Sequence, residues 1–246
     1  MALVSDTAMV LYYNIAGDNA DHDDWHTYEH MHERLSIPGF LRGSRWIAKS
    51  GKPKYLVVYE VGGVEVSTSA SYLDRLNAPT AWTSAMMTRF RNMIRGFCTV
   101  VASSGFGLGS NALSVRFSPA KGKETELLGW LAQEVIPKIS SRRGMSSASL
   151  LRPALIPPMT KEQSIRGRDT DMTWVLLATG YDAATLESLT NEELGAHVFE
   201  RHGSSSGVEQ GTYRLDYTLS AEEAARSAPN PPLQPDARVG LPGGKM

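Results

Sequence analysis

The sequence predicts an α+β protein of two βαββαβ units in tandem, which is the chain order of ferredoxin-like folds. Short runs rich in β-branched and aromatic residues alternate with segments in which apolar residues recur every three or four positions. The order strand, helix, strand, strand, helix, strand occurs once before residue 105 and once after residue 110. The glycine-rich stretch 105–109 (GFGLG) lies between the two and is expected to be a linker.

The first unit begins with a short aromatic strand and a long helix that Pro38 and Gly39 terminate. That helix is expected within the segment 23–40 and ends at Pro38 and Gly39. Two strands joined by a turn follow, then two helices and a last strand. The expected strands are 9–15, 40–48, 55–61 and 97–102, and the two later helices are 69–76 and 80–94.

The second unit repeats this order with little sequence identity. Its charged segment 159–171 is expected to be a loop, and the tail 227–246, rich in proline and glycine, an extended arm or disordered. We therefore divide the chain into units 1–106 and 107–226 and the tail 227–246. The expected strands of the second unit are 112–117, 146–156, 172–181 and 212–219, and its helices are 125–139 and 186–200.

The bulk composition excludes several classes of protein. The 246 residues are 41% hydrophobic and 21% charged, and the net charge of −1 gives no general attraction to nucleic acid or anionic membranes. No apolar run approaches the roughly 18 residues of a membrane span, and the N-terminus lacks the features of a signal peptide. The single cysteine, Cys98, cannot form an intrachain disulfide and fits a reducing compartment. We expect a cytoplasmic protein without nucleic-acid or membrane partners.

The helix expected in 23–40 concentrates groups that can move a proton or hold an anion. His22, His26, His30 and Glu33 follow one stripe of this helix, beside a stripe of apolar residues that includes Trp25. A histidine near its ordinary pKa can take or give a proton, and a nearby carboxylate can stabilise its cation. The competing interpretation is structural, with these groups capping the helix and forming salt bridges. We take His30 as the main acid–base candidate, with three helpers: His26, Glu29 and Glu33.

A pocket between this helix and the sheet would suit a planar, apolar or aromatic substrate whose acidic group meets an arginine. Each aromatic residue in it could equally be ordinary core. His26 and His30 also have a spacing that can place two imidazoles on one metal, with Glu33 as a third ligand, but helical histidine pairs often arise by chance. We therefore expect no metal. The expected substrate-binding residues are Arg34, Tyr12, Trp25, Arg45, Tyr59 and Trp82.

The motif DWHTYEHMHERLSIPGF, with the later YLVVYEV and NAPTAWTSAMM, resembles bacterial proteins of the dimeric α/β-barrel superfamily, most of all EthD-like and related uncharacterised members. The matching residues include Trp25, Glu29, His30, Glu33 and Arg34. His26 stands where an aromatic residue is usual, and His32 where a proline is common. The resemblance implies that the two units form one barrel within the chain, and it leaves a homodimer possible.

The superfamily includes cofactor-free monooxygenases, isomerases, cyclases and haem enzymes, so the fold alone does not fix the reaction. We expect an enzyme without organic cofactor that uses His30 as general acid or base on a small aromatic or unsaturated metabolite, as a lyase, isomerase or dehydratase. Arg34 or Arg45 would hold an anionic or carbonyl oxygen. The alternatives are a cofactor-free monooxygenase and a non-catalytic ligand-binding or assembly protein.

Overall fold

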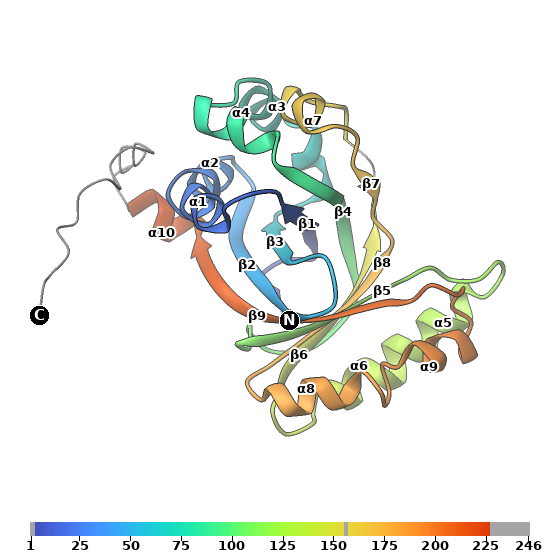
Figure 1. Ribbon diagram of the computed structural model, residues 1–246. Helices are drawn as coiled ribbons and strands as arrows, with labels where there is room; N and C mark the ends of the chain where they lie inside the picture. The colour runs from blue at the N-terminus through green and yellow to red at the C-terminus, as the bar shows by residue number, and fades with distance from the viewer. Residues whose placement is uncertain (1–2, 155–156, 227–246) are drawn as a thin grey trace, which may run out of the picture.

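The computed structural model describes residues 3–154 and 157–226, and within them eight antiparallel strands close into a barrel with helices packed outside (Figure 1). Each half of the chain contributes four strands, in the spatial orders β2-β3-β1-β4 and β6-β8-β5-β9. The order of elements and their pairing confirm the prediction of tandem ferredoxin-like units forming a barrel within one chain. The expected tail 227–246 lies outside the described residues. In the part of the chain that is described, no helix is long and apolar enough to cross a membrane.

The first unit forms the upper half of Figure 1, where its helices cover one side of the barrel. The long helix predicted in 23–40 is present, but it contains one π-helical turn, η1. The elements of this unit are β1 (Thr7–Ile15), α1 (Asn19–Trp25), η1 (His26–His30), α2 (Met31–Leu35), β2 (Phe40–Ser50), β3 (Tyr55–Val61), η2 (Val64–Thr68), α3 (Ala70–Asn77), α4 (Ala81–Met87) and β4 (Phe90–Gly105).

The second unit covers the opposite side of the barrel with most of its helices, but α7 lies beside α3 and α4 of the first unit and α10 packs against α2 (Figure 1). Its elements are β5 (Asn111–Phe117), α5 (Glu124–Trp130), η3 (Leu131–Val135), α6 (Ile136–Ser140), β6 (Met145–Pro153), α7 (Lys161–Arg166), β7 (Thr170–Asp171), β8 (Trp174–Gly180), α8 (Ala183–Leu189), α9 (Ala196–Arg201), β9 (Glu209–Ser220) and α10 (Ala221–Arg226).

Two long strands join the halves. The N-terminal part of β4 pairs with β1 of its own unit, and its C-terminal part pairs with β6 of the other unit. In the same way β9 pairs first with β5 and then with β2. Each half therefore completes the sheet of the other, and the barrel has no free edge between them.

The helix predicted over 80–94 is wrong in its second half, because α4 ends at Met87 and β4 begins at Phe90. A β-bulge explains the misleading pattern. One residue of β1, Tyr13, lies opposite two residues of β4 at this point, Asn92 and Met93, and Asn92 has a positive φ of 54°. The extra residue puts Phe90 and Met93 in the same apolar cluster under the helices. A spacing of three, typical of a helix, thus arises in a strand.

Two further predictions are corrected in the second unit. The segment 159–171, expected to be a loop, contains α7 and the short strand β7. Its helix had a sequence signal, since Thr160 and Gln163 have the spacing of a capping box, and the Gln163 side chain accepts a hydrogen bond from the Thr160 N–H. The helix expected over 186–200 is two helices, α8 and α9, with Gly195 in a non-helical conformation before the second.

Candidate active site

A pocket that is partly open to solvent lies on the outer face of the first unit's sheet, under its helices. Alternation along β1 sends Met9, Leu11 and Tyr13 to this face, whereas Tyr12 belongs to the cluster inside the barrel. The helix α1–η1–α2 forms one wall of the pocket, and α7 contributes to the wall facing it. The sheet gives a largely apolar floor, apart from Arg95 of β4, and the helices carry the other charged groups.

Three histidines follow the buried face of the helix at intervals of four residues. The ring centroids of His22 and His26 are 5.7 Å apart, and those of His26 and His30 are 5.8 Å apart. Tyrosine hydroxyls of the sheet meet the first two rings: Tyr13 lies 3.1 Å from His22 Nε2, and Tyr59 lies 3.2 Å from His26 Nε2. All three rings are buried and lie on one face of the helix. Only His26 and His30 line the pocket.

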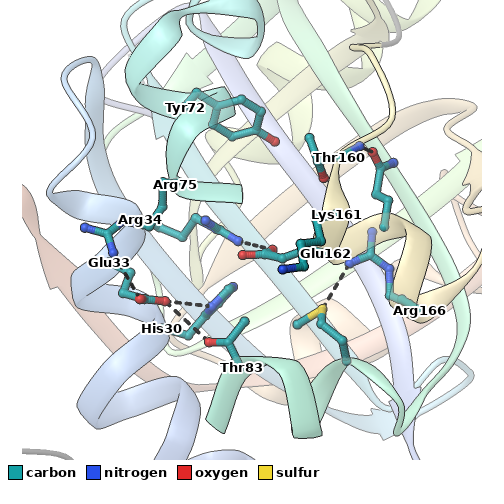
Figure 2. Close-up of polar contacts among 12 residues, drawn as sticks. His30, Glu33, Arg34, Tyr72, Arg75, Thr83, Thr160, Lys161, Glu162 and Arg166 are labelled. Atoms are coloured by element: carbon teal, nitrogen blue, oxygen red, sulfur yellow. Dashed lines mark hydrogen bonds and ion pairs between the residues drawn. The ribbon is translucent and has the colours of Figure 1, made fainter. Parts of the chain in front are cut away.

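The surroundings of His30 favour the neutral form of its imidazole. Its ring stacks on Trp25 with centroids 4.2 Å apart, and Glu33 Oε2 lies 3.6 Å from its Nδ1 (Figure 2). Burial and the nearby Arg34 guanidinium hold the pKa of His30 well below its ordinary value. A carboxylate beside Nδ1 favours the proton on that nitrogen and leaves Nε2 able to accept another. Burial raises the pKa of Glu33.

Arg34 on α2 forms a buried ion pair with Glu162 on α7 (Figure 2). The two residues are 3% and 2% exposed. The pair uses one nitrogen and one oxygen, so Arg34 Nη1 and Glu162 Oε1 are buried without a hydrogen-bond partner among the described residues. Both side chains line the pocket. Two side chains that line the pocket therefore hold a donor and an acceptor without a hydrogen-bond partner among the described residues.

Two more arginines line the pocket, and both are bound to Asp169. Arg95 also donates a hydrogen bond to the Tyr72 hydroxyl, and Arg166 contacts the sulfur of Met87. These contacts occupy the two guanidinium groups more fully than Arg34 is occupied. Arg34 is thus the best-placed cation for a ligand oxygen.

The structure brings five of the residues selected from the sequence to the pocket wall: Trp25, His26, His30, Arg34 and Tyr59. Glu33 supports His30 but is not part of the wall.

Four others lie elsewhere. Tyr12 points into the barrel, where its hydroxyl lies 2.6 Å from Ser114 Oγ. Arg45 is buried against Asp216 and the backbone of α1. Glu29 accepts hydrogen bonds from Thr80 and Thr83, and Trp82 packs against the apolar cluster under the helices.

Sequence reasoning missed the contribution of α7, namely Glu162, Gln163 and Arg166, and also Tyr72 and Arg95. The capping-box spacing at Thr160 could have revealed the helix. Nothing in the sequence reveals that a helix of the second unit lies over the first unit's pocket, because this depends on how the two halves close into a barrel.

The second unit provides an internal comparison for the site. Its helix also contains a π-helical turn, η3, and each turn is followed at the same distance by a glycine with positive φ, Gly39 at 94° and Gly144 at 90°. The two helices therefore align residue by residue. The counterparts of His22, His26, His30 and Arg34 are Leu127, Leu131, Val135 and Ile139, all buried in an apolar core.

This comparison separates the demands of the fold from those of the site. A helix with a π-helical turn packs on the sheet with leucine, valine and isoleucine at these positions, which bury without any cost of desolvating a polar group. The first unit places imidazoles and a guanidinium there, at a cost in stability. π-helical turns occur often at functional sites, and here η1 carries polar groups into the pocket, whereas the buried residues of η3 are apolar.

The geometry does not support the metal alternative. Among residues 3–154 and 157–226, no group of three or more His, Cys, Asp or Glu side chains lies close enough together to hold a metal ion.

Comparison with protein-family models and with curated protein sequences finds no match. Similar solved structures include an anthrone oxidase-like protein, with 10% identity and a TM-score of 0.64 over 89% of this chain and 94% of that one. Putative monooxygenases from Fusobacterium nucleatum (7% identity) and Lactobacillus acidophilus (9%) each give a TM-score of 0.56. They cover 89% and 87% of this chain and 96% of their own.

At these identities the similarity establishes the fold, a ferredoxin-like dimeric α/β-barrel formed within one chain. The similar chains are matched over almost their whole length, so they share the two-unit arrangement. The closer resemblance to EthD-like proteins stays a prediction.

Proposed function

We propose that the chain is an enzyme in which neutral His30 removes a proton from a small, planar, mostly apolar molecule bound under α1–α2. One observation carries this proposal. His26, His30 and Arg34 are buried at positions that the second unit fills with Leu131, Val135 and Ile139. The fold does not need these polar groups. A buried polar group destabilises the folded state unless it forms a hydrogen bond or ion pair, and proteins keep such groups mainly at functional sites.

The residues divide the work between binding and proton transfer. Met9, Leu11 and Trp25 give apolar surfaces for a flat ring system. Arg34 is placed to bind a carbonyl oxygen and to stabilise the negative charge that grows on it as the neighbouring carbon or hydroxyl loses its proton. That proton goes to His30 Nε2, and Glu33 stabilises the imidazolium from the Nδ1 side.

The fate of the anion decides the reaction class. Return of the proton to another carbon gives an isomerase, and loss of a leaving group from the adjacent carbon gives a lyase or dehydratase. Both need only the groups described above, and no organic cofactor.

A cofactor-free monooxygenase is the second candidate. Its support is that similar structures are named an anthrone oxidase-like protein and putative monooxygenases. The same proton abstraction gives a carbanion to which dioxygen can add; uptake of a proton and loss of water then convert a CH₂ group into a carbonyl group. The third candidate, a non-catalytic binding protein, would use the pocket without proton transfer. We place the protein in the cytoplasm, and a homodimer is compatible with each candidate.

Proton abstraction can be tested before the substrate is known. The protein is incubated in deuterated water with planar ketones and phenols, and deuterium at their acidic carbon positions is measured by mass spectrometry. We expect the wild-type chain to catalyse exchange, His30→Val to lose it, and His32→Ala, which changes a histidine outside the pocket wall, to keep it.

Repeating the incubation with and without dioxygen separates an oxygenase from a lyase or isomerase, because only the oxygenase forms an oxygenated product. Binding of compounds without any exchange would overturn the catalytic proposal and favour the binding protein.

A further inference from the structure

The polar end of the pocket is completed by a helix from the other unit. The first unit connects β2 to β3 by the short turn 51–54, whereas the second unit inserts α7 and β7 between β6 and β8. This insertion packs against α3 and α4 of the first unit and brings Glu162 to Arg34 (Figure 2).

The Arg34–Glu162 pair leaves one atom unused on each side. Arg34 Nη1 is a donor and Glu162 Oε1 is an acceptor, and both are buried without a partner in the described part of the chain. An unsatisfied polar atom in a buried site is unfavourable, and more so when it belongs to a charged group. A ligand that offers an acceptor to Arg34 and a donor to Glu162 would satisfy both at once.

Charge decides between a neutral ligand and an anion. The positive charge of Arg34 is already balanced by Glu162, and a carboxylate placed against Arg34 would also face the carboxylate of Glu162. Arg95 and Arg166 share the single carboxylate of Asp169, so the remaining positive charge of the pocket lies with these two arginines and not with the Arg34–Glu162 pair. At the Arg34–Glu162 pair itself, a neutral group with adjacent acceptor and donor atoms therefore fits better than a second anion.

We infer that Arg34 and Glu162 together recognise the neutral edge of a planar molecule on which a carbonyl oxygen lies beside an O–H or N–H group. Arg34 donates to the carbonyl oxygen, and Glu162 accepts from the adjacent hydroxyl or amide N–H. Glu162 is thus the residue that sets specificity. This inference names the substrate class of the proposed function. It rests on the proposed function only because both use the same pocket.

Two chemical sources give such an edge, a hydroxy-ketone and a cyclic cis-amide. The probes are 2-acetyl-1-naphthol and 2-quinolone, each compared with its O-methyl or N-methyl counterpart, and 1-hydroxy-2-naphthoate as an anion. Binding is measured by calorimetry on the full chain. We expect at least one unmethylated probe to bind about tenfold or more tightly than its methylated counterpart, as for a hydrogen bond to a charged group. The probe that shows this preference identifies the source.

The Glu162→Gln variant gives the sharper test. Its amide NH₂ donates where the carboxylate accepts, so the preference for the unmethylated probe should fall to a ratio near one. Because this variant leaves Arg34 without a counter-charge, Arg34→Ile combined with Glu162→Leu is a second variant that leaves no buried charge and should also lose the preference.

Three results would overturn the inference: an unchanged preference in both variants, no preference in the wild-type chain, or tightest binding of 1-hydroxy-2-naphthoate. His30→Val should keep the preference. If the wild-type chain prefers the unmethylated probe but catalyses no proton exchange, the proposed reaction is rejected. The recognition of the probe by Arg34 and Glu162 then still holds.

Discussion

Arg34 and Glu162 are 128 positions apart in the chain and meet as a buried ion pair that joins α2 of the first unit to α7 of the second. Each of the two buried charges is balanced by the other, because neither side chain has another charged partner within 4 Å among the described residues. The pair is a link between the units as well as the polar end of the pocket.

Removing one member of this pair should destabilise the fold more than removing both. Glu162→Leu leaves Arg34 buried without a counter-charge, and we expect the free energy of unfolding to fall by about 3–5 kcal/mol. Arg34→Ile together with Glu162→Leu leaves no buried charge and should cost less than either single change. Urea denaturation of the wild-type chain and the three variants gives the double-mutant cycle. Additive losses would contradict the pairing.

The two units predict which substitutions the first helix tolerates. His26→Leu combined with His30→Val copies Leu131 and Val135 of the second unit. We expect the free energy of unfolding at pH 7.5 to change by no more than about 1 kcal/mol. Loss of the contact between the Tyr59 hydroxyl and His26 is offset by removal of the two buried Nδ1 atoms, which have no hydrogen-bond partner among the described residues. Proton exchange should be lost. A large loss of stability in urea denaturation would show that the histidines are structural.

The same histidines should make the wild-type chain sensitive to acid. Burial lowers the pKa of His26 and of His30 in the folded chain, whereas in the unfolded chain each has the ordinary value of about 6.5. Below that pH the unfolded chain binds protons that the folded chain does not, so the free energy of unfolding falls as the pH drops. The fall ends only below the lowered pKa of the folded state.

Each histidine contributes at most about 1.4 kcal/mol per pH unit in this window. Urea denaturation between pH 7.5 and 5 should therefore give a shallower slope for the His26→Leu, His30→Val double variant than for the wild-type chain. Equal slopes would mean that these two rings take up protons in the folded chain at the same pH as in the unfolded chain.

Glu33 and Glu29 lie on the same helix and give a matched pair for the acid–base step. Glu33→Gln removes the negative charge 3.6 Å from His30 Nδ1, and we expect proton exchange to slow by about tenfold or more because the imidazolium loses its stabilising partner. Glu29→Gln changes a carboxylate held by Thr80 and Thr83 and should have a much smaller effect on the exchange rate. Equal effects would assign both residues a structural role.

Local patterns in the sequence were enough to predict the tandem units and the wall of the pocket that comes from one helix. The four-residue spacing of His22, His26 and His30 gives one face in any helix, and the burial of that face follows from the packing of Trp25 beside it. The strands were recognised because their apolar residues are continuous or alternate.

What failed depends on contacts between distant segments. Tyr12 was expected in the pocket, but neighbouring residues of a strand point to opposite faces, and only the closing of the barrel decides which face is inside. The bulge at Asn92 turned a strand pattern into a helical one. Glu162 was missed because its partner lies in the other unit.

The sharing of β4 and β9 between the halves has a consequence for stoichiometry. In a barrel assembled from two identical chains, every substitution occurs twice, and two equivalent cavities must be maintained. Here the halves are covalently joined and differ, so one keeps an imidazole-lined cavity while the other keeps a hydrocarbon interior and lends a helix to its neighbour. A titration should therefore saturate at one equivalent of ligand per chain, whether the chains associate or not.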